Sequence, residues 1–92
     1  MTLGEKLKAL REQHGLLLRQ VAAAMEVGEG FISKIEHDEK PINKGHLQRF
    51  AQLYKVAEEE LLPYWLAQKV RKTIQDEMFG KKALEIVLKD LH

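Results

Sequence analysis

The amino-acid sequence predicts an all-α protein of five short helices followed by a two-helix extension. Apolar residues recur every three or four positions, as on one face of a helix, and the strict alternation typical of strands is almost absent. Helix-start and helix-end signals separate these segments at short intervals. The chain has 92 residues, 45% of them hydrophobic and 32% charged, so it is long enough for one small globular domain.

Local signals predict where the first two helices lie. Thr2 followed by Glu5 is a capping-box pattern that opens a first helix. Gly15 stands where a left-handed cap would end that helix. The apolar spacing from Leu18 to Met25 then predicts a second helix of about two turns.

The next two helices are separated by a loop. Gly28–Gly30 interrupt the second helix, and a third short helix is expected to end near His37. The segment Asp38–Ile42 contains a proline and is expected to be a loop. Asn43 is a favourable N-cap for a fourth helix, whose apolar stripe ends at Tyr54.

The last part of the chain predicts a short fifth helix over Glu58–Leu62 and then an extension. Pro63 suits the first position of a helix, so we expect a new helix to begin there. This helix has an apolar residue every four positions, at Leu66, Val70, Ile74 and Met78. Gly80 is expected to break it before a last helix. That helix carries a narrow apolar stripe of Leu84, Val87, Leu88 and Leu91.

Composition excludes several classes of function. The chain has no cysteine, which excludes disulfides, thiolate metal sites and a cysteine nucleophile. No apolar stretch approaches the ~20 residues that span a bilayer, and nothing at the N-terminus reads as a secretory signal. We therefore expect a soluble cytoplasmic protein with no membrane partner. The formal net charge is only +1, so any basic surface for nucleic acid must be local.

The most informative pattern lies between Leu18 and His37. Ala22 is the small residue that a helix-turn-helix needs where its two helices cross. A turn of about three to four residues separates two short helices, as that unit requires. The apolar residues that would bury one face of each helix are Val21, Met25, Val27, Ile32 and Ile35.

Together with its flanks, this pattern resembles the Xre/Cro-type helix-turn-helix family of the lambda-repressor-like fold. The resemblance covers about residues 3–62 and includes Leu17-Leu18-Arg19-Gln20-Val21-Ala22 and Ile32-Ser33-Lys34-Ile35-Glu36. It implies a five-helix DNA-binding domain over residues 1–62, and an extension over residues 63–92. Similar small bacterial regulators include restriction–modification controllers, antitoxins and phage repressors.

Three positions depart from the family pattern. Leu18 stands where the family usually has a phosphate-contacting Gln, and Arg19 next to it is expected to make that contact instead. Glu26 occupies the turn position that usually carries Gly, which predicts either a strained turn or a different geometry. Asp38 replaces a loop Gly and is one of the few side chains that tolerate left-handed backbone.

The resemblance makes the third helix the recognition helix of a major-groove reader. With Ile32 and Ile35 facing the core, the outward residues are candidates for base reading. Lys34 would donate to guanine, Ser33 to a base or phosphate, and Glu29 would accept from cytosine. The base-reading candidates are Glu29, Gly30, Phe31, Ser33, Lys34 and His37.

Alternative interpretations of these residues stay open. Glu29 would also complement a helix N-terminus, and Lys34 would also be an ordinary solvated lysine. Phe31 would either pack beside the core or touch a thymine methyl group. Glu36 is expected to be structural, pairing with Arg11 or Arg49. The phosphate-contact candidates are Arg19, Lys40 and Lys44.

We expect neither a metal nor a cofactor. The four histidines are scattered, at positions 14, 37, 46 and 92, without the spacing of a metal site. No Ser–His–Asp grouping or phosphate-cradling loop is recognisable, so we expect no enzymatic activity.

The extension predicts a homodimer. Its apolar residues exceed what two helices can bury against themselves, because the first sixty residues are expected to hold a complete core. Two recognition helices would then face a (pseudo)palindromic operator in double-stranded DNA. The dimerisation candidates are Tyr64, Trp65, Leu66, Val70, Ile74, Met78, Leu84, Val87, Leu88 and Leu91.

Two functions from different classes follow. The first is a sequence-specific DNA-binding transcriptional regulator, a repressor or autoregulator, which the recognition-helix residues favour. The second is an antitoxin or anti-repressor that binds a protein partner through its C-terminal helices, which the near-neutral charge and apolar extension favour.

Overall fold

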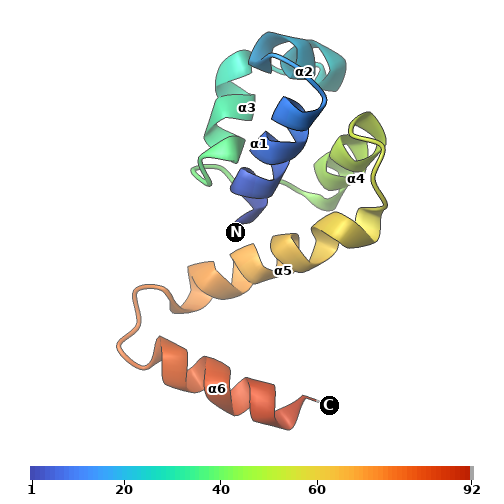
Figure 1. The fold of residues 1–92 in the computed structure, drawn as a ribbon. Coiled ribbons are helices and arrows are strands. Elements are labelled where there is room, and N and C mark those ends of the chain that lie inside the picture. The colour runs from blue at the N-terminus through green and yellow to red at the C-terminus, as the bar shows by residue number, and fades with distance from the viewer. Residues whose placement is uncertain (92) are drawn as a thin grey trace.

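The computed structural model describes residues 1–91, and within them the chain forms six α-helices and no strand (Figure 1). The predicted all-α class is confirmed. None of these helices is both long and apolar enough to cross a membrane. The helices are α1 (Leu3–Gln13), α2 (Leu18–Met25), α3 (Glu29–Glu36), α4 (Lys44–Leu53), α5 (Glu58–Ile74) and α6 (Gly80–Asp90).

The hydrophobic core is enclosed by α1 to α4 and the first turns of α5. Each helix contributes the apolar face that its spacing predicts, and α6 contributes nothing to this core. The buried apolar residues are Leu3, Leu7, Leu10, Val21, Ala22, Met25, Ile32, Ile35, Ile42, Leu47, Phe50, Ala51, Tyr54 and Leu61. The core therefore lies directly beneath the α2–α3 unit and supports it.

Most helix ends follow from local hydrogen bonds. The capping box at α1 is complete: the Glu5 amide donates to Thr2 Oγ1 at 3.1 Å, and the Thr2 amide donates to Glu5 Oε1 at 2.8 Å. The Asn43 side chain accepts from the His46 amide at 2.7 Å and opens α4. Gly15 has φ +66°, the left-handed cap predicted after α1.

The prediction that Pro63 begins a new helix is wrong, because Pro63 lies inside α5. The expected fifth helix and the first helix of the extension are one continuous helix, so residues 1–91 form six helices where seven were expected. Pro63 and Glu59, whose carbonyl loses its donor four residues later, are both exposed, so water can satisfy that oxygen. Leu61 and Trp65, one on either side of Pro63, pack on the core and keep the residues around Pro63 in one helix.

The core also extends further along the chain than expected. Tyr64 and Trp65 are half-buried against it, and Trp65 Nε1 donates to the Ile42 carbonyl at 2.9 Å. The first sixty residues are thus not a complete core, because the second turn of α5 helps to close it. Most of the contact surface of these two aromatic side chains is therefore buried within their own chain.

The two helices of the C-terminal part form a hairpin. α5 ends at Ile74, so Met78 lies in the connecting loop and not on the apolar stripe that was expected to include it. Gly80 does not end a helix but begins α6, and it packs so closely on the Ile74 carbonyl that a Cβ would have no room. This contact turns the chain back, and α6 runs in the opposite direction along α5 (Figure 1).

Candidate nucleic-acid interface

The α2–α3 unit has the geometry of a helix-turn-helix. α2 ends at Met25, and its C-cap Glu26 has a left-handed backbone with φ 59° and ψ 43°. The Val27 amide donates to the Ala22 carbonyl at 3.0 Å and closes the turn, and Ala22 itself is buried. Of the two outcomes expected at Glu26, the strained left-handed turn is the one observed.

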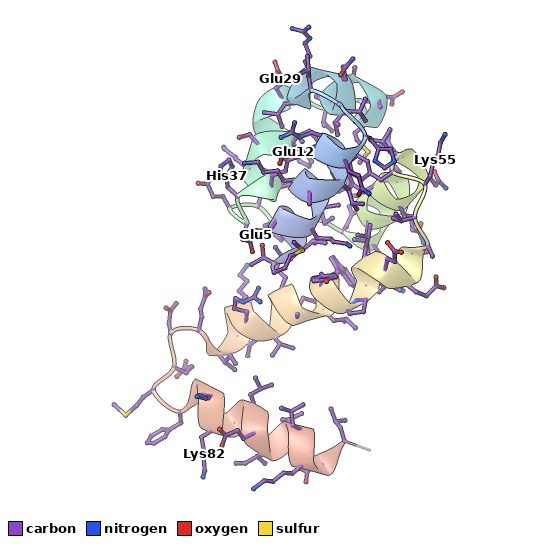
Figure 2. All side chains as sticks on the ribbon, viewed as in Figure 1. Glu5, Glu12, Glu29, His37, Lys55 and Lys82 are labelled. Atoms are coloured by element: carbon purple, nitrogen blue, oxygen red, sulfur yellow. The ribbon has the colours of Figure 1, made fainter. Side chains whose placement is uncertain are left out.

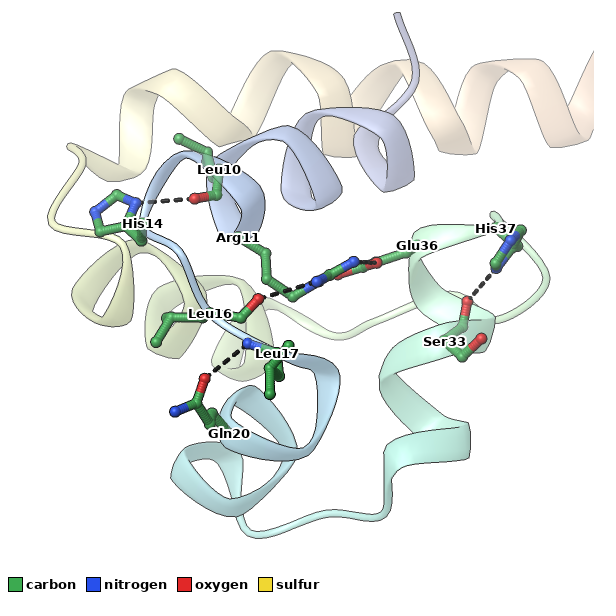
Figure 3. A network of polar contacts seen from close by, with 9 residues as sticks. All are labelled: Leu10, Arg11, His14, Leu16, Leu17, Gln20, Ser33, Glu36 and His37. Atoms are coloured by element: carbon green, nitrogen blue, oxygen red, sulfur yellow. Dashed lines mark hydrogen bonds and ion pairs between the residues drawn. The ribbon is translucent and has the colours of Figure 1, made fainter.

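α3 presents a polar face on its outer side. Ile32 and Ile35 are buried, whereas Lys34 and His37 are exposed and Ser33 is half-buried. Glu29 and Gly30 are exposed in the first turn of the helix. The His37 ring is held by its Nδ1, which donates to the Ser33 carbonyl at 2.7 Å (Figure 3). The short side chains and the exposed cation of Lys34 thus lie on the surface of a firmly packed helix.

The end of α3 is held against α1 by a buried ion pair (Figure 3). Arg11 Nε donates to Glu36 Oε2 at 2.8 Å and Arg11 Nη2 donates to Glu36 Oε1 at 3.1 Å, so the contact is bidentate. Arg11 Nη1 also donates to the Leu16 carbonyl at 3.0 Å. The hydrogen bonds with Glu36 raise the pKa of the Arg11 guanidinium above its ordinary value. The predicted structural role of Glu36 is realised with Arg11, while Arg49 instead donates to the Ala24 carbonyl at 3.4 Å.

A second set of contacts ties the same end of α3 to the start of α1. Asp38 has the predicted left-handed backbone, with φ 60°. Its carboxylate accepts from Thr2 Oγ1 at 2.6 Å and from the Gly4 amide at 2.9 Å. A Cβ on Gly4 would lie 2.5 Å from the Glu36 carbonyl oxygen, so only glycine lets the two helices approach this closely. No role for Gly4 was predicted from the sequence. A glycine in the first turn of a helix, where no turn requires it, nevertheless indicates a close contact with another part of the backbone.

Phe31 packs between α3 and α4. Its ring centroid lies 5.4 Å from that of His46 at an interplanar angle of 60°. The Lys40 ammonium lies 5.2 Å from the Phe31 ring centroid, within the range of a cation–π contact. The half-buried Phe31 thus packs beside the core, and it orients a lysine of the α3–α4 loop.

A model of the helix-turn-helix domain family matches residues 2–63. The chain belongs to the helix-turn-helix domain family. The match starts at the N-cap of α1 and ends within α5, so it contains the whole α2–α3 unit and most of the chain. It supports DNA as the partner of this domain. No solved structure matches the chain.

The cations proposed for phosphate contact are exposed residues near the starts of α2 and α4 and in the loop between α3 and α4. Arg19 is exposed in the first turn of α2, and Lys44 is the exposed first residue of α4. Lys40 is exposed in the loop between α3 and α4. Leu18, which replaces the usual Gln, is half-buried against the core, whereas Arg19 next to it is an exposed cation.

The dimerisation candidates lie on α5, on α6 and in or next to the segments that flank α6, and most of them are outside the hydrophobic core. Leu66 and Val70 on α5, and Val87, Leu88 and Leu91 on or next to α6, are 43–66% exposed. With half-buried Ile74 and Leu84 they line an open apolar groove of about 810 Å³ between the two helices. The structure therefore brings seven of the ten dimerisation candidates together. Tyr64 and Trp65 face the core, and Met78 projects from the loop.

Proposed function

We propose that the protein is a sequence-specific DNA-binding transcriptional regulator of the Xre/Cro type, a non-enzymatic repressor or autoregulator that reads an operator through α3. One observation carries this proposal: the helix-turn-helix unit presents an exposed polar face on a helix whose other face is fully buried. The Arg11–Glu36 ion pair and the Asp38 contacts hold that helix, which supports a reading surface of defined geometry.

The side chains of α3 suggest distinct roles in recognition. Lys34 is proposed to donate to guanine in the major groove, and Glu29 to accept from cytosine. Gly30 lets the backbone approach the DNA, and Ser33 donates to a base or a phosphate. His37 completes the proposed base-reading set at the end of the helix. Phe31 acts from the side of α3, since its ring is engaged by His46 and Lys40.

The phosphate contacts are proposed for Arg19, Lys40 and Lys44. All three are exposed, and they belong to the start of α2, the α3–α4 loop and the start of α4. Phosphate contacts set the position and orientation of a protein on the duplex without reading its sequence. A local set of cations is sufficient for this role even though the formal net charge is only +1.

We further propose a division of labour in which residues 1–62 bind DNA and residues 63–92 form a homodimer. The open groove on α5 and α6 supports this, because contiguous exposed apolar surface normally marks an interaction site. A two-fold dimer would present two copies of α3 to half-sites about 34 Å apart in a (pseudo)palindromic operator. Restriction–modification control is one circuit in which such a regulator works, and a neighbouring methyltransferase gene would support it.

Selection from a random duplex library tests the regulator function. The wild-type chain is expected to enrich one sequence at moderate salt. Lys34→Ala should weaken binding by about 1–3 kcal/mol and relax preference at one position. Lys44→Ala should weaken binding to all DNA sequences by about the same factor. It should also reduce the slope of the logarithm of the binding constant against the logarithm of the salt concentration by about 1.

Lys55→Gln is the matched control, because it removes one positive charge from the side of the domain opposite His37 (Figure 2). This variant should retain the wild-type preference. Recovery of no enriched sequence by the wild-type chain would overturn the regulator function.

The apolar groove also favours a second candidate function. An antitoxin or anti-repressor would place a helix of its target protein in the α5–α6 groove, and α3 would then need no DNA. The same library selection discriminates between the two, since an interaction module of this kind would enrich no DNA sequence.

A further inference from the structure

The charges on the α5–α6 hairpin are arranged unfavourably within one chain. The first turn of α5 carries Glu58, Glu59 and Glu60, and its last turn carries Arg71 and Lys72. α6 begins with Lys81 and Lys82 directly after Gly80. Because α6 runs back along α5, its basic start lies next to the basic end of α5 (Figure 1). Asp76 and Glu77 in the connecting loop offset only two of these four positive charges, so this end of the hairpin keeps a net positive charge. No ion pair links the two helices within residues 1–91, where the single pair is Arg11–Glu36.

The shape of the hairpin has a closed end and an open end. At the closed end Gly80 packs on the Ile74 carbonyl, and from there α5 and α6 diverge in the view of Figure 1. At the open end the groove is bordered by Pro63 and Leu66 on α5 and by Leu88 and Leu91 on the other side. This leaves an apolar opening that α5 and α6 of one chain do not fill.

The loop at the closed end is itself apolar and exposed. Met78 is 88% exposed and Phe79 is 73% exposed. Two neighbouring side chains of this size on a loop tip are candidates for burial in an interface. The hairpin thus has a protruding apolar tip at one end and an apolar opening at the other.

From this pattern we infer that a second copy of the chain docks hairpin to hairpin, with the two-fold axis perpendicular to α5 and α6 and the tip of each hairpin in the open end of the other. This inference rests on the homodimer of the proposed function and adds its orientation. In this arrangement α6 of the second copy runs parallel to α5. Met78 and Phe79 of each copy then enter the opening beside Leu66 and Leu91 of the other.

Charge complementarity selects this arrangement over the alternative. The basic start of α6 in the second copy meets the acidic start of α5, so Lys81 and Lys82 face Glu59 and Glu60 across the interface. If the two hairpins instead pointed the same way, each α6 would start beside a basic α5 end, as it does within one chain. Like charges placed together disfavour that orientation, while opposite charges favour the inferred one.

Charge reversal tests the orientation by sedimentation equilibrium at low ionic strength. Glu59→Lys/Glu60→Lys makes both ends of the contact basic, and Lys81→Glu/Lys82→Glu makes both acidic. Each double variant alone should raise the dimer Kd by about tenfold or more. An equimolar mixture of the two should form a heterodimer with a Kd near that of the wild-type dimer, and the four changes in one chain should restore the homodimer. Added salt should reduce all of these differences.

The mixture also controls for folding, because a misfolded chain would not be rescued by its complement. Lys8→Glu/Lys55→Glu is the matched control, a double reversal at exposed lysines of the helix-turn-helix domain, and it should dimerise as the wild type does. If both double variants dimerise normally, or the mixture stays monomeric while the wild type dimerises, the orientation is wrong although the homodimer stands. A wild-type chain that is monomeric throughout the micromolar range overturns the homodimer itself. The groove would then be left to a helix of another protein.

Discussion

The Arg11–Glu36 ion pair is expected to be the most sensitive polar contact in the domain. It joins the last turn of α1 to the end of α3 through two hydrogen bonds. The side chains of Arg11 and Glu36 are only 12% and 4% exposed. Glu36→Gln preserves the shape of the side chain but leaves the guanidinium charge largely buried without its counter-ion.

The expected loss follows from opposing terms. At the 2.8 Å separation of Arg11 Nε and Glu36 Oε2, two unit charges attract by about 6 kcal/mol at an effective dielectric constant of 20. Burying each ion costs several kcal/mol, so the intact pair contributes little net stability. Removing one partner leaves the desolvation cost of the other ion without the attraction that offset it, which typically destabilises a protein by about 3–5 kcal/mol. We expect about 3 kcal/mol here, because Arg11 retains its hydrogen bond to the Leu16 carbonyl.

Urea unfolding followed by circular dichroism measures this loss. A domain of this length has a free energy of unfolding of about 5–14 kcal/mol, so a loss of 3 kcal/mol is a large fraction. The accompanying decrease in Tm should be roughly 12–24 °C.

The double variant Arg11→Met/Glu36→Leu is the control, because it removes both buried charges and should recover most of the stability. If Glu36→Gln is destabilised by less than about 1 kcal/mol, the pair is not a buried charge pair in solution.

Three further outcomes follow from single side chains. Within residues 1–91 the buried hydroxyl of Tyr54 has no hydrogen-bond partner. Tyr54→Phe should therefore leave the free energy of unfolding in urea unchanged or raise it by up to about 1 kcal/mol, and a clear decrease would reveal a partner. Glu26→Gly should relieve the left-handed strain and raise the same free energy by about 0.5–1 kcal/mol, whereas Glu26→Ala, which keeps the Cβ, should not. Hydrogen bonds from Thr2 hold the pKa of Glu5 below its ordinary value, so this carboxylate stabilises the fold above its unfolded-state pKa. The benefit is lost as the pH falls through the folded-state pKa. The Tm difference between wild type and Glu5→Gln should therefore disappear in acid, and a difference that persists there would contradict this linkage.

The positions of most helices, and the face that each one buries, were predictable from the sequence. The Thr2–Glu5 box, the Asn43 cap and the left-handed residues Gly15 and Asp38 are all found as predicted. Such signals act between residues at most four positions apart, where the chain itself keeps the partners together. The outward face of α3 was predictable for the same reason, because burial of Ile32 and Ile35 determines which residues point to solvent.

Contacts between residues far apart in the sequence decided the rest. Pro63 is a local signal for a helix start, yet α5 continues through it because buried Leu61 and half-buried Trp65 pack against a core built from distant helices. The choice of Arg11 over Arg49 as the partner of Glu36 depends on how α1 packs on α3. The close approach at Gly4 depends on the same packing.

The extension shows the same division. Its apolar stripes were predictable from the sequence. The packing of Tyr64 and Trp65 on the core and the position of Met78 in the loop were not. A periodic apolar pattern predicts which face of a helix is buried, but it does not predict which residues cover that face. The reason is that hydrophobic burial is non-directional and can involve residues at any distance along the chain. The sequence by itself thus determined the local helices and the polar face of α3. Only the tertiary structure decided which apolar residues close the core and which remain exposed in the α5–α6 groove.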